Sequence, residues 1–138
     1  MPRSLEKLKP GALVAERVFG PITHDMLLAY AEASGDSNPL HLDSEVARKS
    51  GFDDVIIHGM LGMALLGNLL TDAFPAENLK RFNSRFVAIM PVGSRILCRA
   101  QCVESDDTSA ELKVEARLVD TDVTVITGSA NLTLPPVS

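Results

Sequence analysis

The sequence predicts an α+β domain in which a curved antiparallel sheet wraps around one central, buried helix. Residues 59–74 are apolar nearly all round, which is typical of a buried helix. From Leu79 onward the hydrophobic period changes to two, which is typical of half-buried strands. A buried helix followed by antiparallel strands packs as a sheet against that helix.

Composition places the chain among small globular proteins, with 46% hydrophobic and 22% charged residues. Its 138 residues suit a single domain over residues 1–138. The net charge of −5 argues against nucleic-acid binding, because that depends on Lys and Arg contacts to phosphates. The N-terminus lacks the apolar core of a secretory signal, and the apolar run in 59–74 is shorter than the ~20 residues that span a bilayer. We therefore expect a cytoplasmic protein with no membrane anchor.

The first half of the chain predicts one strand and two helices before the buried helix. A strand over 14–19 ends at Gly20 and Pro21. Thr23 is placed to cap a helix that ends at Gly35, and a short helix over 44–49 stops at Gly51.

The second half predicts antiparallel hairpins. Apolar and polar residues alternate over 96–103 and again over 110–118, and the polar segments 104–108 and 120–122 suit tight turns. A last strand covers 123–134. Cys98 and Cys102 lie on the same face of one strand, too far apart along it to form a disulfide, so we expect reduced core residues.

The run 34–41, Ser-Gly-Asp-Ser-Asn-Pro-Leu-His, places the carboxylate of Asp36 five residues before the imidazole of His41. Gly35 permits unusual dihedral angles and Pro39 favours extended geometry at Asn38, so we expect a shaped turn. A carboxylate and an imidazole can share one water molecule, which suits acid/base chemistry without a metal ion. The alternative is that the Asp and Asn side chains only cap their own backbone, and that His41 is a polar surface group.

This run and its continuation resemble the signature of the MaoC-like (R)-specific enoyl-CoA hydratases, also called hydratase 2. The resemblance covers nearly the whole chain. The residues that carry it are Tyr30, Ser34, Gly35, Asp36, Asn38, Pro39, His41, Ala47, His58, Gly59 and Met60, followed by Arg85, Phe86, Pro91, Val92 and Gly93.

The resemblance implies the hotdog fold and a reaction. Water would add across the double bond of a trans-2-enoyl thioester to give an (R)-3-hydroxyacyl thioester, with Asp36 and His41 activating the water. The substrate would be a thioester of coenzyme A or of an acyl carrier protein, and no cofactor or metal ion is implied. The alternatives are a (3R)-hydroxyacyl-acyl carrier protein dehydratase subunit of fatty-acid elongation, a non-catalytic hotdog that binds acyl thioesters, and a thioesterase.

Three further residues of the motif have two interpretations each. Gly59 opens the buried helix, where free N–H groups could stabilise an enolate oxygen, or it only lets the chain turn into the helix. The resemblance favours an oxyanion-hole amide. Asn38 positions the water or the turn, or is a plain turn residue before Pro39. His58 takes part in chemistry, or hydrogen-bonds backbone beside the helix start.

One position departs from the family pattern, and two surface properties follow from the predicted fold. Some hydratases carry a hydroxyl residue in the buried helix where this chain has Gly67. A sheet wrapped around one helix leaves its edges open, and pairing of two edges would make a homodimer. The basic residues that could contact an acidic carrier protein or the phosphates of coenzyme A are Arg48, Lys49, Lys80, Arg81 and Arg95.

Overall fold

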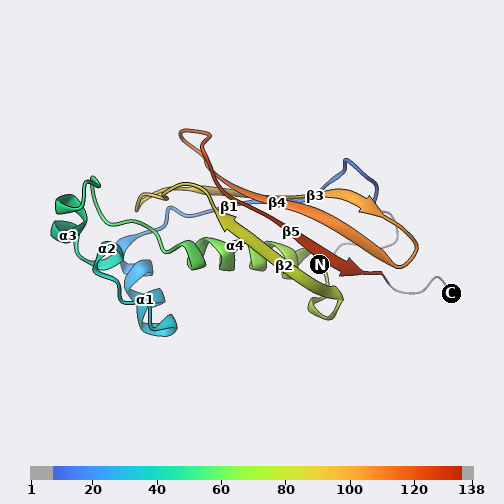
Figure 1. Cartoon of the computed structure of the whole chain (residues 1–138), viewed down its shortest axis with the longest axis horizontal. Coiled ribbons are helices and arrows are strands. Elements are labelled where there is room, and N and C mark those ends of the chain that lie inside the picture. Colours follow the sequence, from blue (N-terminus) through green and yellow to red (C-terminus); the bar gives the residue numbers. More distant parts are fainter. Residues whose placement is uncertain (1–7, 135–138) are drawn as a thin grey trace.

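A five-stranded antiparallel sheet covers one side of a long helix, α4, and three shorter helices lie together beyond one end of it (Figure 1). The structure is a computed structural model and describes residues 8–134. Its elements are β1 (Leu13–Phe19), α1 (His24–Ser34), α2 (Pro39–Leu42), α3 (Ser44–Lys49), α4 (Gly59–Ala73), a 3-10 turn (Ala76–Asn78), β2 (Leu79–Phe86), β3 (Ile96–Ser105), β4 (Ser109–Leu118) and β5 (Thr124–Thr133). The predicted fold class, α+β with a sheet around a central helix, is confirmed.

The order of strands in the sheet is β1-β3-β4-β5-β2. The predicted hairpins between β3, β4 and β5 are confirmed. Strand β2, within the half-buried strands expected from Leu79 onward, does not join β3, the next strand along the chain, but pairs with β5 at the far edge. Alternation of apolar residues identifies a strand but carries no information about its neighbour in the sheet. The open edges are therefore β1 and β2.

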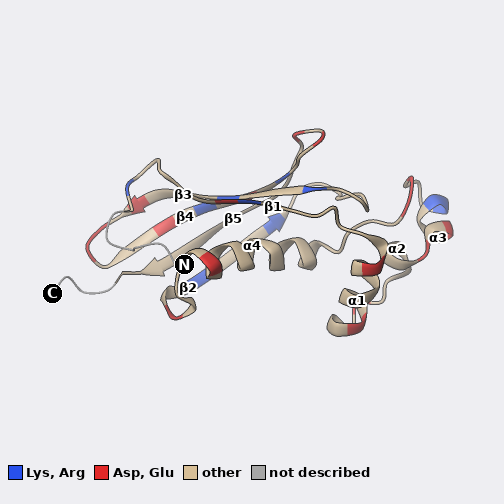
Figure 2. Cartoon of the chain, turned by 180° about the vertical axis from the view of Figure 1, so that it is seen from behind, with Lys and Arg blue, Asp and Glu red and all other residues tan. Residues whose placement is uncertain are grey.

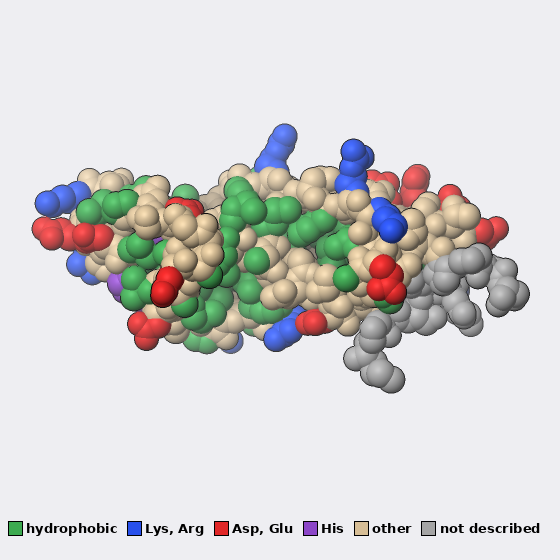
Figure 3. Space-filling model, turned by 90° about the horizontal axis from the view of Figure 1, so that it is seen from below, with side chains coloured by type: hydrophobic (Ala, Val, Ile, Leu, Met, Phe, Trp, Pro, Cys, Tyr) green, Lys and Arg blue, Asp and Glu red, His purple; other side chains and the backbone are tan. Residues whose placement is uncertain are grey.

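Helix α4 packs one side against the concave face of the sheet. The buried side chains of this layer are Leu65, Leu66, Leu69 and Leu70 from the helix and Leu112, Val114, Ala116, Ile126, Ala130 and Leu132 from the strands. The opposite side of α4 is not covered: Met60 is 53% exposed and Ala64 is exposed as well. The expectation that α4 is buried all round is therefore wrong, because the sheet curves around one side only. Figure 3, which shows the molecule from below, has hydrophobic side chains gathered on this face.

Glycine at position 128 allows β2 and β5 to approach closely. The two strands pair Ser84 with Gly128. A Cβ at Gly128 would overlap the backbone carbonyl oxygen of Asn83 and lie 3.0 Å from Cα of Ser84. The obstacles are backbone atoms, so a side chain here would push the edge strand away from the sheet.

The caps of the short helices follow the sequence. Thr23 caps α1, and the helix ends at Gly35, which is left-handed with a φ of 80°. The segment 34–41, expected to be a turn, contains a turn followed by the first part of α2, with Pro39 in the first helical turn. The side chain of Asn38 accepts a hydrogen bond from the N–H of Leu40 at 3.0 Å and so caps α2. Asn38 thus caps its own backbone and holds the turn.

The two cysteines, Cys98 and Cys102, are buried in β3 and free, as expected. Burial raises the pKa of Cys98 to about 12, so its thiol is protonated and unreactive in the folded protein.

None of the helices within residues 8–134 is long and apolar enough to cross a membrane.

We predict that Gly128→Ala lowers the free energy of unfolding by about 2 kcal/mol or more, because the new methyl group displaces backbone. Gly67→Ala is the matched control. Its new Cβ would lie 3.6 Å from the ring of Phe82, an ordinary contact. Alanine in a helix interior is more stable than glycine by up to about 1 kcal/mol, so this variant should be stabilised. Urea unfolding followed by circular dichroism, at one protein concentration, measures the free energy of unfolding of both variants. A Gly128→Ala variant as stable as wild type would contradict the packing argument.

We predict that Asn38→Ala lowers the free energy of unfolding by about 1 kcal/mol through loss of the α2 cap. Asn38→Ser keeps an oxygen that can accept from the N–H of Leu40, so it should retain most of the stability. The same unfolding measurement compares the two variants. An equal loss in both would show that the cap is not what Asn38 contributes.

Candidate active site

Three side chains from separate segments meet at the end of the molecule where α1, α2 and the start of α4 converge. Asp36 follows α1, His41 lies in α2 and His58 directly precedes α4. One oxygen or ring nitrogen from each lies within 4.8 Å of the others. The structure thus brings the predicted pair Asp36 and His41 together, and it adds His58, to which sequence reasoning assigned only a minor place.

Asp36 is exposed, and its position is set by the turn around it. Its own N–H donates to Oγ of Ser34 at 3.2 Å, and its Oδ1 accepts from the N–H of Asn38 at 3.3 Å. The Asx-turn interpretation of Asp36 is therefore correct as far as Oδ1 is concerned. Within residues 8–134, Oδ2 accepts no hydrogen bond from the protein and is free to meet a ligand or a water molecule.

His41 is half-buried and held by the backbone of Ile56. The distance from Nδ1 of His41 to the carbonyl oxygen of Ile56 is 2.7 Å, and the N–H of Ile56 donates to the carbonyl oxygen of Leu40 at 3.0 Å. Since a carbonyl oxygen only accepts, Nδ1 carries the proton and Nε2 keeps its lone pair. This tautomer leaves Nε2 able to take a proton from a bound water molecule.

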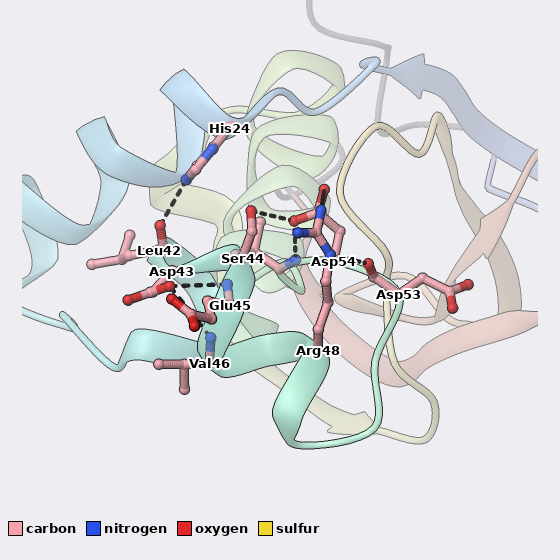
Figure 4. Close-up of polar contacts among 10 residues, drawn as sticks. His24, Leu42, Asp43, Ser44, Glu45, Val46, Arg48, Asp53 and Asp54 are labelled. Carbon is pink, nitrogen blue, oxygen red and sulfur yellow. Dashed lines mark hydrogen bonds and ion pairs between the residues drawn. The ribbon is translucent and has the colours of Figure 1, made fainter.

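The carbonyl oxygen of Ile56, which accepts from His41, lies in a segment that is held in place by hydrogen bonds beside α2 and α3 (Figure 4). Oγ of Ser44 donates to Oδ1 of Asp54 at 2.6 Å, and the N–H of Val55 donates to the same oxygen at 2.7 Å. Both bonds favour the ionised form, so they lower the pKa of Asp54. On the other side, Nε2 of His24 lies 2.9 Å from the carbonyl oxygen of Leu42 and ties α1 to α2. His24 is thus a structural contact outside the cluster.

His58 is the one buried polar residue in the described core, with 1% of its surface exposed. Its Nε2 lies 3.1 Å from the carbonyl oxygen of Asp36. Its ring stacks on the ring of His41 with centroids 3.9 Å apart and planes inclined by 24°, and Tyr30 packs edge-on at 4.8 Å. Burial lowers the pKa of His58, which favours the neutral imidazole. The sequence predicted a backbone hydrogen bond for this residue, but its spacing could not show that the acceptor is Asp36.

Gly59 is the first residue of α4. The N–H groups of Leu61 and Gly62 donate to the carbonyl oxygen of His58, whereas those of Gly59 and Met60 have no acceptor within the described residues. Such free groups at a helix start can bind a negatively charged oxygen. The missing side chain has a second use, because a Cβ at Gly59 would lie 2.9 Å from the ring of Phe86. Phe86, at the end of β2, therefore packs against the helix start, a contact that the sequence did not predict.

The arrangement is suited to proton transfer. Each imidazole uses one ring nitrogen on a backbone carbonyl oxygen, which fixes the orientation of the ring. A free carboxylate oxygen and a free imidazole nitrogen can act on the same water molecule.

Comparison with known proteins identifies the family of this chain. A family model described as "MaoC like domain" matches residues 7–124. The chain is 32% identical over 133 residues to a mitochondrial 3-hydroxyacyl-[acyl-carrier-protein] dehydratase of Arabidopsis thaliana, a match that covers 93% of this chain and 78% of that protein. It is 29% identical over 99 residues to an (R)-specific enoyl-CoA hydratase of Aeromonas caviae, covering 72% of this chain and 66% of that protein.

A solved structure shows the same fold. The unliganded R-hydratase PhaJ1 of Pseudomonas aeruginosa superposes with a TM-score of 0.83 and 25% sequence identity, covering 94% of this chain and 84% of that one. The sheet around helix α4 is therefore the hotdog fold. The match to the family model and the similarity to the Arabidopsis dehydratase together show that the chain belongs to the MaoC-like family of hydratases and dehydratases.

Proposed function

We propose that the protein catalyses the reversible syn hydration of trans-2-enoyl thioesters to (R)-3-hydroxyacyl thioesters. The observation that carries the proposal is the meeting of Asp36 and His41, with a free carboxylate oxygen and a free imidazole nitrogen, in one cluster. The reaction needs a group that takes a proton from water and a group that delivers one to carbon, and it needs no cofactor beyond the thioester itself. These two residues meet that requirement.

The proposed mechanism uses the free oxygen of Asp36, the free ring nitrogen of His41 and the helix start at Gly59. Asp36 Oδ2 and His41 Nε2 hold the water molecule. As its oxygen bonds to the β-carbon, one of the two residues takes up its proton, and a proton is then delivered to the α-carbon on the same face. Between the attack on the β-carbon and the protonation of the α-carbon, the electron pair of the double bond is delocalised onto the thioester oxygen. The N–H of Gly59, with the partial positive charge of the α4 N-terminus, would stabilise this enolate.

A (3R)-hydroxyacyl-acyl carrier protein dehydratase is the alternative, supported by the similarity to the Arabidopsis protein. It uses the same residues in the reverse direction and differs in the carrier. Lys and Arg residues lie along the strands and in α3 (Figure 2). Of the basic residues named as candidates for a carrier contact, Arg48, Lys49 and Arg95 form ion pairs with acidic neighbours, whereas Lys80 and Arg81 of the edge strand β2 form none within the described residues.

We predict that Asp36→Asn and His41→Ala each lower kcat for hydration of crotonyl-CoA by about a hundredfold or more, because each removes a positioned acid/base group. Loss of the conjugated enoyl absorbance measures the rate, and the configuration of the 3-hydroxybutyryl product measures the stereochemistry. Asp25→Asn is the matched control, because Asp25 lies in the first turn of α1 outside the cluster, and it should keep wild-type kcat.

Several outcomes would contradict the hydratase proposal. A folded Asp36→Asn variant with near-normal turnover would exclude Asp36 as an acid/base group. An (S)-configured product would exclude the proposed (R) stereochemistry. Release of free thiol without hydration would indicate a thioesterase. Turnover of a crotonyl-carrier protein with none of crotonyl-CoA would favour the dehydratase alternative. Binding of enoyl thioesters without turnover would favour the alternative of a non-catalytic hotdog protein that binds acyl thioesters.

We also propose that two copies of the chain form a homodimer through the β2 edge. Exposed apolar residues gather where β2 ends and the following segment meets β5, namely Phe86, Val87 and Ile89, with Val123 before β5. The N–H of Val87 donates to the carbonyl oxygen of Val125, so these residues share one surface. An apolar patch at an open sheet edge is what a second copy would cover.

We predict that Ile89→Asp converts the dimer to a monomer, because it places a charge in the proposed interface. Val103→Asp is the matched control, since Val103 in β3 is 45% exposed and Ile89 is 49% exposed. Light scattering coupled to gel filtration gives the molar mass of each variant. A wild-type protein that elutes as a monomer, or an Ile89→Asp variant that remains dimeric, would refute the interface.

A further inference from the structure

His58 connects the two proposed acid/base residues although it needs no contact with the substrate. It lies 22 residues from Asp36 in the sequence and 3.1 Å from its carbonyl oxygen, measured from Nε2. It also stacks on the ring of His41 at 3.9 Å. One buried side chain therefore fixes the backbone that carries the carboxylate and the plane of the imidazole.

The protonation state of His58 follows from these contacts. A carbonyl acceptor requires the proton on Nε2, which leaves Nδ1 as a lone pair. Nδ1 is buried and has no hydrogen-bond partner within residues 8–134. A second proton there would find no acceptor among the described residues, would be buried, and would lie beside His41. The groups that face the ring are Asp36, His41 and Tyr30. Burial is the largest effect and lowers the pKa of His58, as does the neighbouring His41, whereas the hydrogen bond to the Asp36 carbonyl oxygen and the charge of the Asp36 carboxylate raise it.

We propose that His58 is a positioning residue that remains neutral and holds Asp36 and His41 in the geometry for proton transfer. This inference rests on the proposed hydratase or dehydratase function. Because stacked imidazoles would repel each other if both were charged, a neutral His58 allows His41 to be the one ring that gains a proton during the reaction.

The tautomer of His58 can be observed without any activity. We expect long-range proton–nitrogen NMR spectra of the ring nitrogens to show His58 as the neutral Nε2–H form at pH 6.5, near the usual histidine pKa of about 6.5. Half-protonation of His58 at that pH, or a proton on Nδ1, would overturn the proposal.

Two variants of similar length test the positioning role. His58→Gln keeps an amide N–H that can reach the carbonyl oxygen of Asp36, whereas His58→Met has no donor. We expect His58→Met to lower kcat by about ten- to a hundredfold, as small misplacements of catalytic groups do. We expect KM to stay near the wild-type value, and His58→Gln to recover most of the lost kcat.

Other results would separate this role from general stability and from the proposed function. If both variants lose folded protein equally and retain wild-type kcat per folded molecule, His58 is structural only and the proposal fails. The same holds if His58→Gln is as slow as His58→Met. A wild-type protein that turns over no enoyl or 3-hydroxyacyl thioester would overturn the proposed function, whereas normal titration of His58 in an active enzyme would overturn only the role of His58.

Discussion

The backbone of residues 55–58 is the constraint on which the rest of the site depends. On one side it hydrogen-bonds to the segment before β3, through Ile57 N–H to the carbonyl oxygen of Met90 and through the pairing of Ile56 with Pro91. On the other side Ile56 bonds to α2 through both its N–H and its carbonyl oxygen. The segment then leads directly into α4 at Gly59. This short extended stretch thus links the segment that carries His41 to the segment before β3 and to the start of α4.

This attachment explains how exposed polar residues can have a defined geometry. Asp36 lies after the left-handed end of α1, and His41 lies in a helix of a single turn, so neither element would hold its shape alone. Each is fixed by a hydrogen bond between a backbone carbonyl oxygen and an imidazole nitrogen: Ile56 with His41, and Asp36 with His58. The free atoms that remain are those that proton transfer from water requires.

The uncovered side of α4 relates the fold to the proposed assembly. A sheet that curves around one side of a helix buries that side and leaves the other in contact with solvent, where Met60 and the apolar residues after β2 are exposed. Phe86 lies at this boundary, against Gly59 and beside the open edge strand. The same residues would therefore form part of a dimer interface and of the wall beside the candidate active site, so assembly and catalysis would depend on one surface.

The sequence by itself determined the elements and the core of the motif. The strand β1, the helices α1, α3 and α4, and the β3–β5 hairpins follow from hydrophobic period and capping residues, which act over a few positions. Asp36 and His41 are five residues apart, so their meeting is also a local property of one turn. Only the tertiary structure decided that β2 lies at the far edge, that one side of α4 is uncovered and that His58 binds the carbonyl oxygen of Asp36. These depend on contacts between segments distant in sequence, and hydrophobic period carries no information about which distant segments meet.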